Sequence, residues 1–185
     1  MTPQPAKPRV LIVDDHPANR LAFETLLEEN YTVNVAASGY QALELTLREE
    51  FAVILLDVKM PGMDGFEVAE LLRKRERTSH TPIVFISAYD QTVLQMKKGY
   101  IVGATDFIFS PVDEELLKFK VATYAHIFLR NEALRFQIRD LEATVAALRE
   151  DFRGRGSSDA SILGRIKSLE GNVEGLKREM ESRVP

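Results

Sequence analysis

The sequence of 185 residues has no cysteine and no long apolar run. The first absence excludes disulfide bonds and thiolate metal sites, and it fits the reducing cytoplasm, where we expect the protein to reside. The second excludes a membrane-spanning helix, which needs ~20 predominantly apolar residues. Residues 1–8 are polar and rich in proline. They lack the apolar core of a signal peptide. We predict that they form a flexible N-terminus.

Strong positive charge is also missing. The formal net charge is −4, which argues against nucleic acid as the main partner. Residues 129–185 hold 11 Lys and Arg and 10 Asp and Glu, so the acidity lies in the N-terminal part. A hydrophobic content of 45% is ordinary for a globular chain, and the length fits one domain with an extension.

Short apolar runs alternate with amphipathic stretches from the start of the chain. The runs, several of them rich in β-branched residues, predict buried strands, and the stretches between them predict helices with one apolar face. Five strands alternating with helices indicate a doubly wound, parallel five-stranded α/β sheet of the (βα)5, flavodoxin-like type. We predict strands over residues 10–13, 31–36, 53–56, 83–86 and 107–109, and helices from 17, over 41–50, 65–75 and 91–102, and from 113 onward.

Apolar residues continue at steps of three and four beyond the expected end of the fifth helix. This heptad pattern predicts a parallel two-stranded coiled coil, and therefore a homodimer, through residues 124–152. Asn131 falls at an a position, where asparagine commonly fixes register and dimeric state. The a and d positions are Tyr124, Ile127, Asn131, Leu134, Ile138, Leu141, Val145, Leu148 and Phe152.

Glycine and serine interrupt this pattern at residues 154–161, which indicates a break or linker. A second amphipathic helix is predicted over residues 162–185 in the same heptad register. The spacing leaves open whether this helix stacks on the coil, folds back as a hairpin or lacks order. A single amphipathic helix folding back on the N-terminal domain would show the same spacing.

Carboxylates follow two of the predicted strands, and a hydroxyl follows another. Asp14 and Asp15 close the first strand, Asp57 the third and Ser87 the fourth. Because the carboxyl ends of parallel strands meet at one edge, these side chains converge, and three carboxylates there repel one another unless a cation neutralises them. Mg²⁺ prefers such oxygen ligands, and a carboxylate beside it can attack a phosphoryl group.

Three blocks of sequence carry a family resemblance. They are Val10–Asp15 (VLIVDD), Leu56–Gly65 (LDVKMPGMDG) and Phe85–Ala88 (FISA). In order and spacing they resemble the signature blocks of the response-regulator receivers of bacterial two-component signalling. The resemblance covers roughly residues 8–128, and its blocks taken together are highly specific. It implies phosphorylation by a sensor histidine kinase or a phosphotransfer protein.

The resemblance also assigns roles to individual residues. It implies that Asp57 is the phosphoacceptor, and that Asp14, Asp15, Asp57 and the backbone carbonyl of Lys59 hold Mg²⁺. It further implies that Ser87 is the switch hydroxyl. Phe107 stands in the place of the aromatic residue whose rotamer reports the switch.

One position departs from the family's pattern. Receivers place a lysine before the proline that follows the fifth strand, and this chain has Ser110-Pro111, a bond that the resemblance implies is cis. Serine keeps a hydrogen-bond donor but loses the positive charge. Charge-assisted hydrogen bonds are the stronger kind, so we expect weaker coupling between phosphorylation and conformational change. Metal binding rests on the carboxylates and should survive.

Several of these residues also have a purely structural interpretation. Asp14 and Asp15 are suited to capping a helix before Pro17, and serine is common at strand ends, as at Ser87. His16 has no obvious metal partner in the sequence. His126 lies on the predicted coil, but Ile127–Arg130 lacks the acidic neighbour and proline of a kinase dimerisation helix, so we expect a solvated histidine.

The sequence therefore predicts a receiver over residues 9–128 and a coiled-coil helix over residues 129–153. Its expected function is a phosphorylation-dependent signalling module that presents a dimer to a downstream protein. We expect no enzymatic activity beyond phosphorylation and dephosphorylation of Asp57. One alternative, favoured by Ser110, is an adaptor or dimerisation module that phosphorylation does not switch. Another is the regulatory front of a longer signalling enzyme, such as a cyclic-dinucleotide synthase, a hydrolase or a hybrid kinase.

Overall fold

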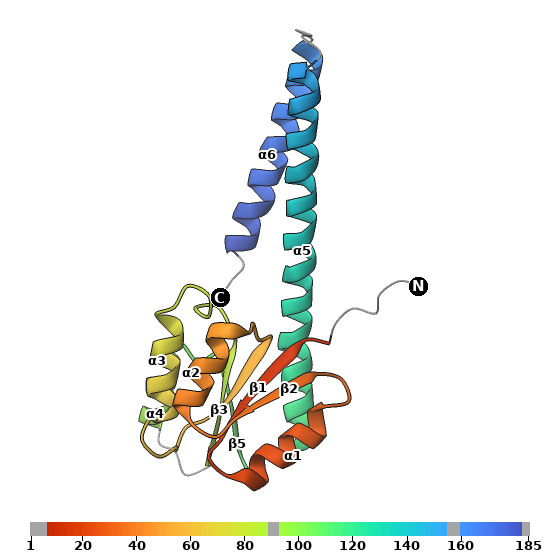
Figure 1. The fold of residues 1–185 in the computed structure, drawn as a ribbon. Coiled ribbons are helices and arrows are strands. Elements are labelled where there is room, and N and C mark those ends of the chain that lie inside the picture. Colours follow the sequence, from red (N-terminus) through yellow and green to blue (C-terminus); the bar gives the residue numbers. More distant parts are fainter. Residues whose placement is uncertain (1–6, 89–92, 155–159, 183–185) are drawn as a thin grey trace. The chain divides into compact units, whose positions relative to one another are not determined.

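The computed structural model describes residues 7–88, 93–154 and 160–182, and the chain divides into two compact units, residues 1–128 and 129–185 (Figure 1). The expectations for residues 1–6, for the start of the fourth helix at 91–92, for the linker at 155–159 and for the last three residues fall outside the described part. None of the described helices is long and apolar enough to cross a membrane.

The first unit is built on a five-stranded parallel sheet with the strand order β2-β1-β3-β4-β5, which confirms the predicted fold. Strand order reverses between β1 and β3, because β2 lies on one side of β1 and the later strands lie on the other. Each predicted strand is present. The strands are β1 (Arg9–Val13), β2 (Thr32–Ala36), β3 (Val53–Asp57), β4 (Ile83–Ala88) and β5 (Asp106–Ser110).

Helices cover both faces of this sheet. Alternate strand residues point to opposite faces, so Val10 and Ile12 pack with Leu27 of α1 and Leu117 of α5, whereas Leu11 packs with residues of α2 and α3. The helices of this unit are α1 (Pro17–Leu27), α2 (Gly39–Arg48), α3 (Gly65–Arg73), α4 (Val93–Ile101) and the first part of α5 (Glu114–Gly154).

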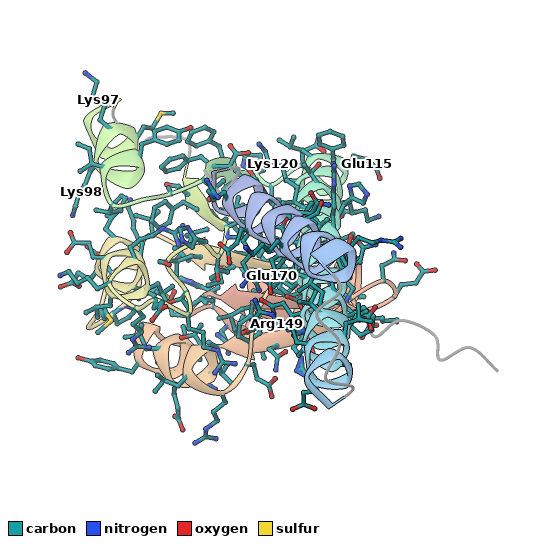
Figure 2. All side chains as sticks on the ribbon, turned by 90° about the horizontal axis from the view of Figure 1, so that it is seen from above. Lys97, Lys98, Glu115, Lys120, Arg149 and Glu170 are labelled. Atoms are coloured by element: carbon teal, nitrogen blue, oxygen red, sulfur yellow. The ribbon has the colours of Figure 1, made fainter. Side chains whose placement is uncertain are left out.

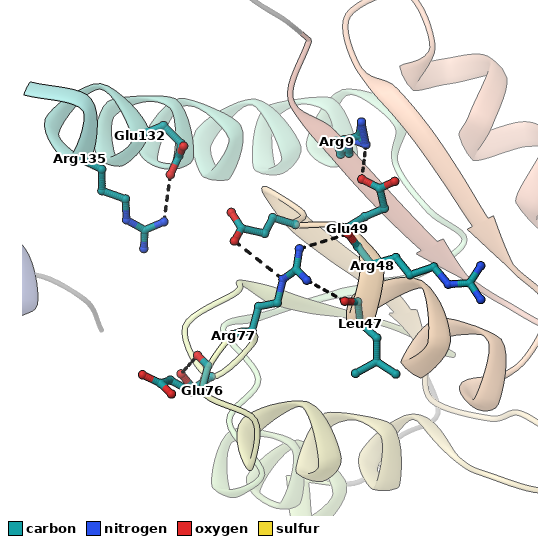
Figure 3. A network of polar contacts seen from close by, with 10 residues as sticks. Arg9, Leu47, Arg48, Glu49, Glu76, Arg77, Glu132 and Arg135 are labelled. Carbon is teal, nitrogen blue, oxygen red and sulfur yellow. Dashed lines mark hydrogen bonds and ion pairs between the residues drawn. The ribbon is translucent and has the colours of Figure 1, made fainter. Parts of the chain in front are cut away.

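Capping fixes where α2 and α3 begin and end. α2 begins two residues before the predicted start at Gln41, because the Ser38 side chain caps it by accepting from the Gln41 N–H. Asp64 and Glu67 form a reciprocal capping box at the start of α3. At the other end of α2, Arg77 donates to the carbonyls of Leu47 and Arg48 at 2.7 and 3.2 Å (Figure 3), which satisfies carbonyls that the helix leaves open.

The second unit is a helical hairpin formed by the C-terminal part of α5 and by α6 (Ala160–Ser182) (Figure 1). Lys177 forms an ion pair with Glu142 at 2.5 Å, and Arg149 pairs with Glu170. Later residues of α5 therefore pair with earlier residues of α6, so the helices are antiparallel. Of the arrangements that the sequence left open for this segment, the structure has the hairpin. Among its described side chains, Ile138, Val145, Ile166 and Val173 are buried.

Tyr124 packs in the first unit, whereas the heptad pattern predicted that it belongs to a coiled coil. Its ring packs against the core of the first unit, and its hydroxyl lies 3.3 Å from a carboxylate oxygen of Asp106, which also pairs with Lys120. Burial, followed by the charge of Asp106, raises the pKa of Tyr124 to about 12. The heptad pattern assigned Tyr124 to the first a position of a coil, whereas this ring contacts the core of the first unit in the structure.

Candidate functional site

The candidate site lies at the carboxyl edge of the sheet, where strand order reverses between β1 and β3. Asp14 and Asp15 directly follow β1, and Asp57 is the last residue of β3. Asp57 is in register with Ile86 of β4, so Ser87 lies one residue further toward the same edge. Ligands of open α/β sheets bind at such a switch point. The sequence predicted this convergence, and the structure has it.

The first turn of α1 fixes the carboxylate of Asp14. Asp14 is 2% exposed, and its carboxylate accepts hydrogen bonds from the His16 N–H at 2.7 Å and from the Asn19 side-chain amide at 2.9 Å. Arg20 donates to the backbone carbonyl of Asp14 at 2.6 Å. Sequence reasoning missed Asn19 and Arg20, whose roles depend on how α1 turns back over the end of β1.

Asp15 has an oxygen atom without a hydrogen-bond partner. Its Oδ1 is buried, and no described residue hydrogen-bonds to it. The Nδ1 atom of His16 lies 2.9 Å away, and this contact is an ion pair only when the imidazole is protonated. Leaving a buried carboxylate oxygen unpaired costs free energy. A cation at this position would remove that cost.

The environment of Asp57 disfavours its charged form. Burial, followed by the charge of Asp14 and then that of Asp15, raises the pKa of Asp57 to about 6, against the opposing effect of the backbone N–H groups of Lys59 and Val58. Asp57 is only half-buried, so a phosphoryl donor in solvent can reach it. Three carboxylates thus influence one another at this edge.

These residues fit a hard divalent cation. The ligand atoms of Asp14, Asp15 and His16 lie within 4.8 Å of one another, and Asp57 is electrostatically coupled to both aspartates. Mg²⁺ takes oxygen ligands and keeps several waters. The three carboxylates match that preference, whereas the largely exposed imidazole of His16 does not.

An open pocket of about 540 Å³ lies next to the carboxylates. It is lined by Asp15, Val58, Lys59, Met60, Pro61, Asp64, Phe66 and Lys98. Two lysines therefore face an acidic site. Lys59 was predicted, but only for its backbone carbonyl. Lys98 was missed, because it lies in the middle of α4 and belongs to no motif.

The remaining predicted residues lie on β4 and β5. Ser87 is buried, whereas Ser110 is exposed at the end of β5. The Ser110-Pro111 bond is cis, which confirms the expectation for it. Phe107 is buried, with its ring 5.4 Å from that of Phe85 and 5.1 Å from that of Tyr100, measured between centroids.

Comparison with known proteins gives a consistent picture. The family model described as response regulator receiver domain matches residues 10–122. Response regulator PleD of Caulobacter vibrioides is 40% identical over 128 residues, which are 69% of this chain and 28% of that protein. Protein PilH of Pseudomonas aeruginosa is 36% identical over 110 residues, which are 59% of this chain and 90% of that protein.

A solved structure agrees with the fold. Chemotaxis protein CheY4 of Vibrio cholerae superposes with a TM-score of 0.61 at 32% sequence identity, covering 64% of this chain and 99% of that one.

The sensor protein GacS of Pseudomonas syringae pv. syringae is 38% identical over 146 residues, which are 76% of this chain and 16% of that protein. The chain thus spans less than a third of the length of PleD and less than a fifth of that of GacS.

Proposed function

Because the chain belongs to the family of response regulator receiver domains of two-component signalling, we propose that Asp57 accepts a phosphoryl group in a Mg²⁺-dependent step. The donor is a sensor histidine kinase or a phosphotransfer protein in the cytoplasm. The observation that carries the proposal is the convergence of Asp14, Asp15 and Asp57 at the ends of β1 and β3.

The residues of the chain have separable tasks in this step. Asp14, Asp15, Asp57 and the carbonyl of Lys59 would hold Mg²⁺, which supplies charge neutralisation for the phosphoryl oxygens when it is bound. A carboxylate oxygen of Asp57 attacks phosphorus and forms a P–O bond. The P–N bond of the donor's phosphohistidine breaks, and the imidazole leaves with the bonding electrons.

Ser87 and Phe107 supply the response in this proposal. The Ser87 hydroxyl donates a hydrogen bond to a phosphoryl oxygen, and the movement of β4 is passed to the buried ring of Phe107. Phe107 packs between Phe85 and Tyr100, so its rotamer affects both β4 and α4.

Incubation of the full chain with acetyl phosphate, followed by intact-mass measurement, tests the proposal. We expect one phosphoryl addition with Mg²⁺, none with a chelator, and none in Asp57→Asn. Asp64→Asn is the matched control, because Asp64 lines the same pocket and asparagine still caps α3. Addition that persists in Asp57→Asn would contradict the assignment.

We also propose that the tail forms a homodimer through residues 124–152 and presents it to a downstream protein. In the hairpin, Ile138 and Val145 are already buried with α6. Contacts with a second copy would therefore use the neighbouring d positions, Leu134, Leu141 and Leu148, which are half-buried or exposed. Each leucine buried in the dimer contributes about 1.5–3 kcal/mol.

A second candidate function is an adaptor that phosphorylation does not switch. Ser110 favours it, because this exposed serine cannot supply the positive charge that the family's lysine brings to the phosphoryl group. Hydrogen exchange in β4 and α4 with and without phosphorylation separates the two functions, because only a receiver that switches should change there. The matches cover 28% of PleD and 16% of GacS, so a third candidate is the regulatory part of a longer signalling enzyme.

A further inference from the structure

The candidate site has positively charged residues even though Ser110 replaces the lysine that the family places there. A phosphoryl group on Asp57 adds roughly two negative charges to an edge that already holds Asp14 and Asp15. Mg²⁺ offsets only part of this charge. Ser110 offers a neutral hydroxyl, so the remaining cations must come from other elements. The pocket beside Asp15 is lined by two, Lys59 and Lys98.

Lys98 reaches this pocket from α4. Its Nζ lies 4.5 Å from the ring centroid of Phe66, the second residue of α3, and both residues line the pocket with Asp15. A cation over an aromatic ring at an exposed site is held weakly. The ammonium group can therefore exchange the ring for an anion at little cost. Figure 2 shows the side chains of Lys98 and its neighbour Lys97 leaving α4 in different directions.

We propose that Lys98 supplies the positive charge for the phosphoryl group on Asp57 that Ser110 cannot supply. The inference rests on the proposed function, because it assumes that Asp57 is the phosphoacceptor. In this arrangement the cation that binds the phosphoryl group has moved from the end of β5 to the middle of α4.

The position of Lys98 also connects the site to Phe107. The next residue, Gly99, packs so closely on Phe107 that an added Cβ would overlap the ring. The ring of Tyr100 meets that of Phe107 edge-on at 5.1 Å. Movement of Lys98 toward a phosphoryl group would thus shift the same turn of α4 that contacts Phe107.

Lys59 is the competing cation, and its place in the fold makes it the weaker candidate. Its backbone N–H already acts on Asp57, and its carbonyl is the proposed Mg²⁺ ligand. Lys59 lies on the loop between β3 and α3, so its contact with a phosphoryl group would not move α4. Lys59→Met therefore serves as a separate variant in the test.

The test measures the affinity of the full chain for beryllofluoride, a phosphoryl mimic, by calorimetry in saturating Mg²⁺. We expect Lys98→Met to weaken binding about tenfold, because it removes one charge-assisted interaction. Lys98→Arg should retain most of the affinity. Lys97→Met is the matched control on the same turn and should bind like the unmodified chain. Ser110→Lys added to Lys98→Met should restore the affinity.

The outcomes separate the two proposals. An unmodified chain that binds no beryllofluoride would overturn the proposed function and this inference with it. Binding that survives in Lys98→Met, or that is lost instead in Lys59→Met, would overturn the inference alone. Affinity for Mg²⁺ without beryllofluoride should not fall in Lys98→Met. A parallel loss there would mean that the residue is structural, and would also overturn the inference.

Discussion

Asp57 carries a free-energy cost in the folded protein when no cation is present. Its pKa rises from 3.8 to about 6 on folding, so the folded state holds its proton more tightly than the unfolded state. The stability that comes from this preference is complete below pH 3.8. It is lost as the pH rises through 6. In the metal-free chain, the ionised Asp57 carboxylate thus exists at neutral pH at the expense of fold stability.

Asp57→Asn should therefore stabilise the metal-free chain at pH 7. We expect a gain of about 1–2 kcal/mol after discounting for the partial exposure of the side chain, and a gain that shrinks as the pH falls toward 4. Urea unfolding in the presence of a chelator, at several pH values, measures it. An equal pH dependence in both proteins would contradict the role given to Asp57.

Asp15 should matter most for the cation. Its buried Oδ1 has no hydrogen-bond partner among the described residues. A bound Mg²⁺ would therefore pair with an oxygen that the protein itself leaves unpaired. We expect Asp15→Asn to weaken Mg²⁺ binding by about tenfold or more. Calorimetry with Mg²⁺ checks this. Binding that is unchanged when Asp15 and Asp57 are both replaced by alanine would show that the metal site is misassigned.

At the scale of elements, the C-terminal hairpin depends on a narrow core. Among the side chains of this unit that the structure describes, few are buried, and Val173 of α6 is one of them, at 6% exposure. Charged residues on both helices add ion pairs that contribute little when exposed. Burial of a few aliphatic side chains therefore holds α6 against α5.

Val173→Asp should release α6. A buried, unpaired carboxylate costs about 2–4 kcal/mol, which is large for so small a unit. Hydrogen exchange should show lost protection over residues 160–182 and unchanged protection in β1 and β3. The neighbouring Asn172 is exposed, so Asn172→Asp introduces the same charge and should leave exchange unchanged. Equal effects of the two variants would contradict the hairpin packing.

At the scale of the whole molecule, assembly should rest on the tail. We expect the unmodified chain to be a dimer by light scattering, and the double variant Leu141→Asp with Leu148→Asp to be a monomer. Ala143→Asp with Ala147→Asp is the matched control, because both alanines are exposed on the same helix. Beryllofluoride should change the mass little. A monomer that dimerises only with the mimic would show that the receiver controls assembly.

Sequence patterns predicted the sheet and its acidic edge, because strand periodicity and topology alone bring Asp14, Asp15 and Asp57 together. The hairpin was one of three arrangements that the sequence left open. It could not be selected, since the heptad spacing of Ile138 and Val145 is the same whether their partner is another chain or α6. Lys98 was equally hidden. Its proposed role depends on which way one turn of α4 faces, and the weak apolar pattern of that helix does not define this.

The close packing of Gly99 against Phe107 has a consequence for how this sequence can change over generations. Phe107 lies against Phe85 and Tyr100, so a side chain at position 99 would displace its ring from this packed rotamer. A larger residue at position 99 is therefore accommodated only if Phe107 changes its rotamer or is replaced by a smaller residue. The residue at one of the two positions thus limits which residues the other can accept.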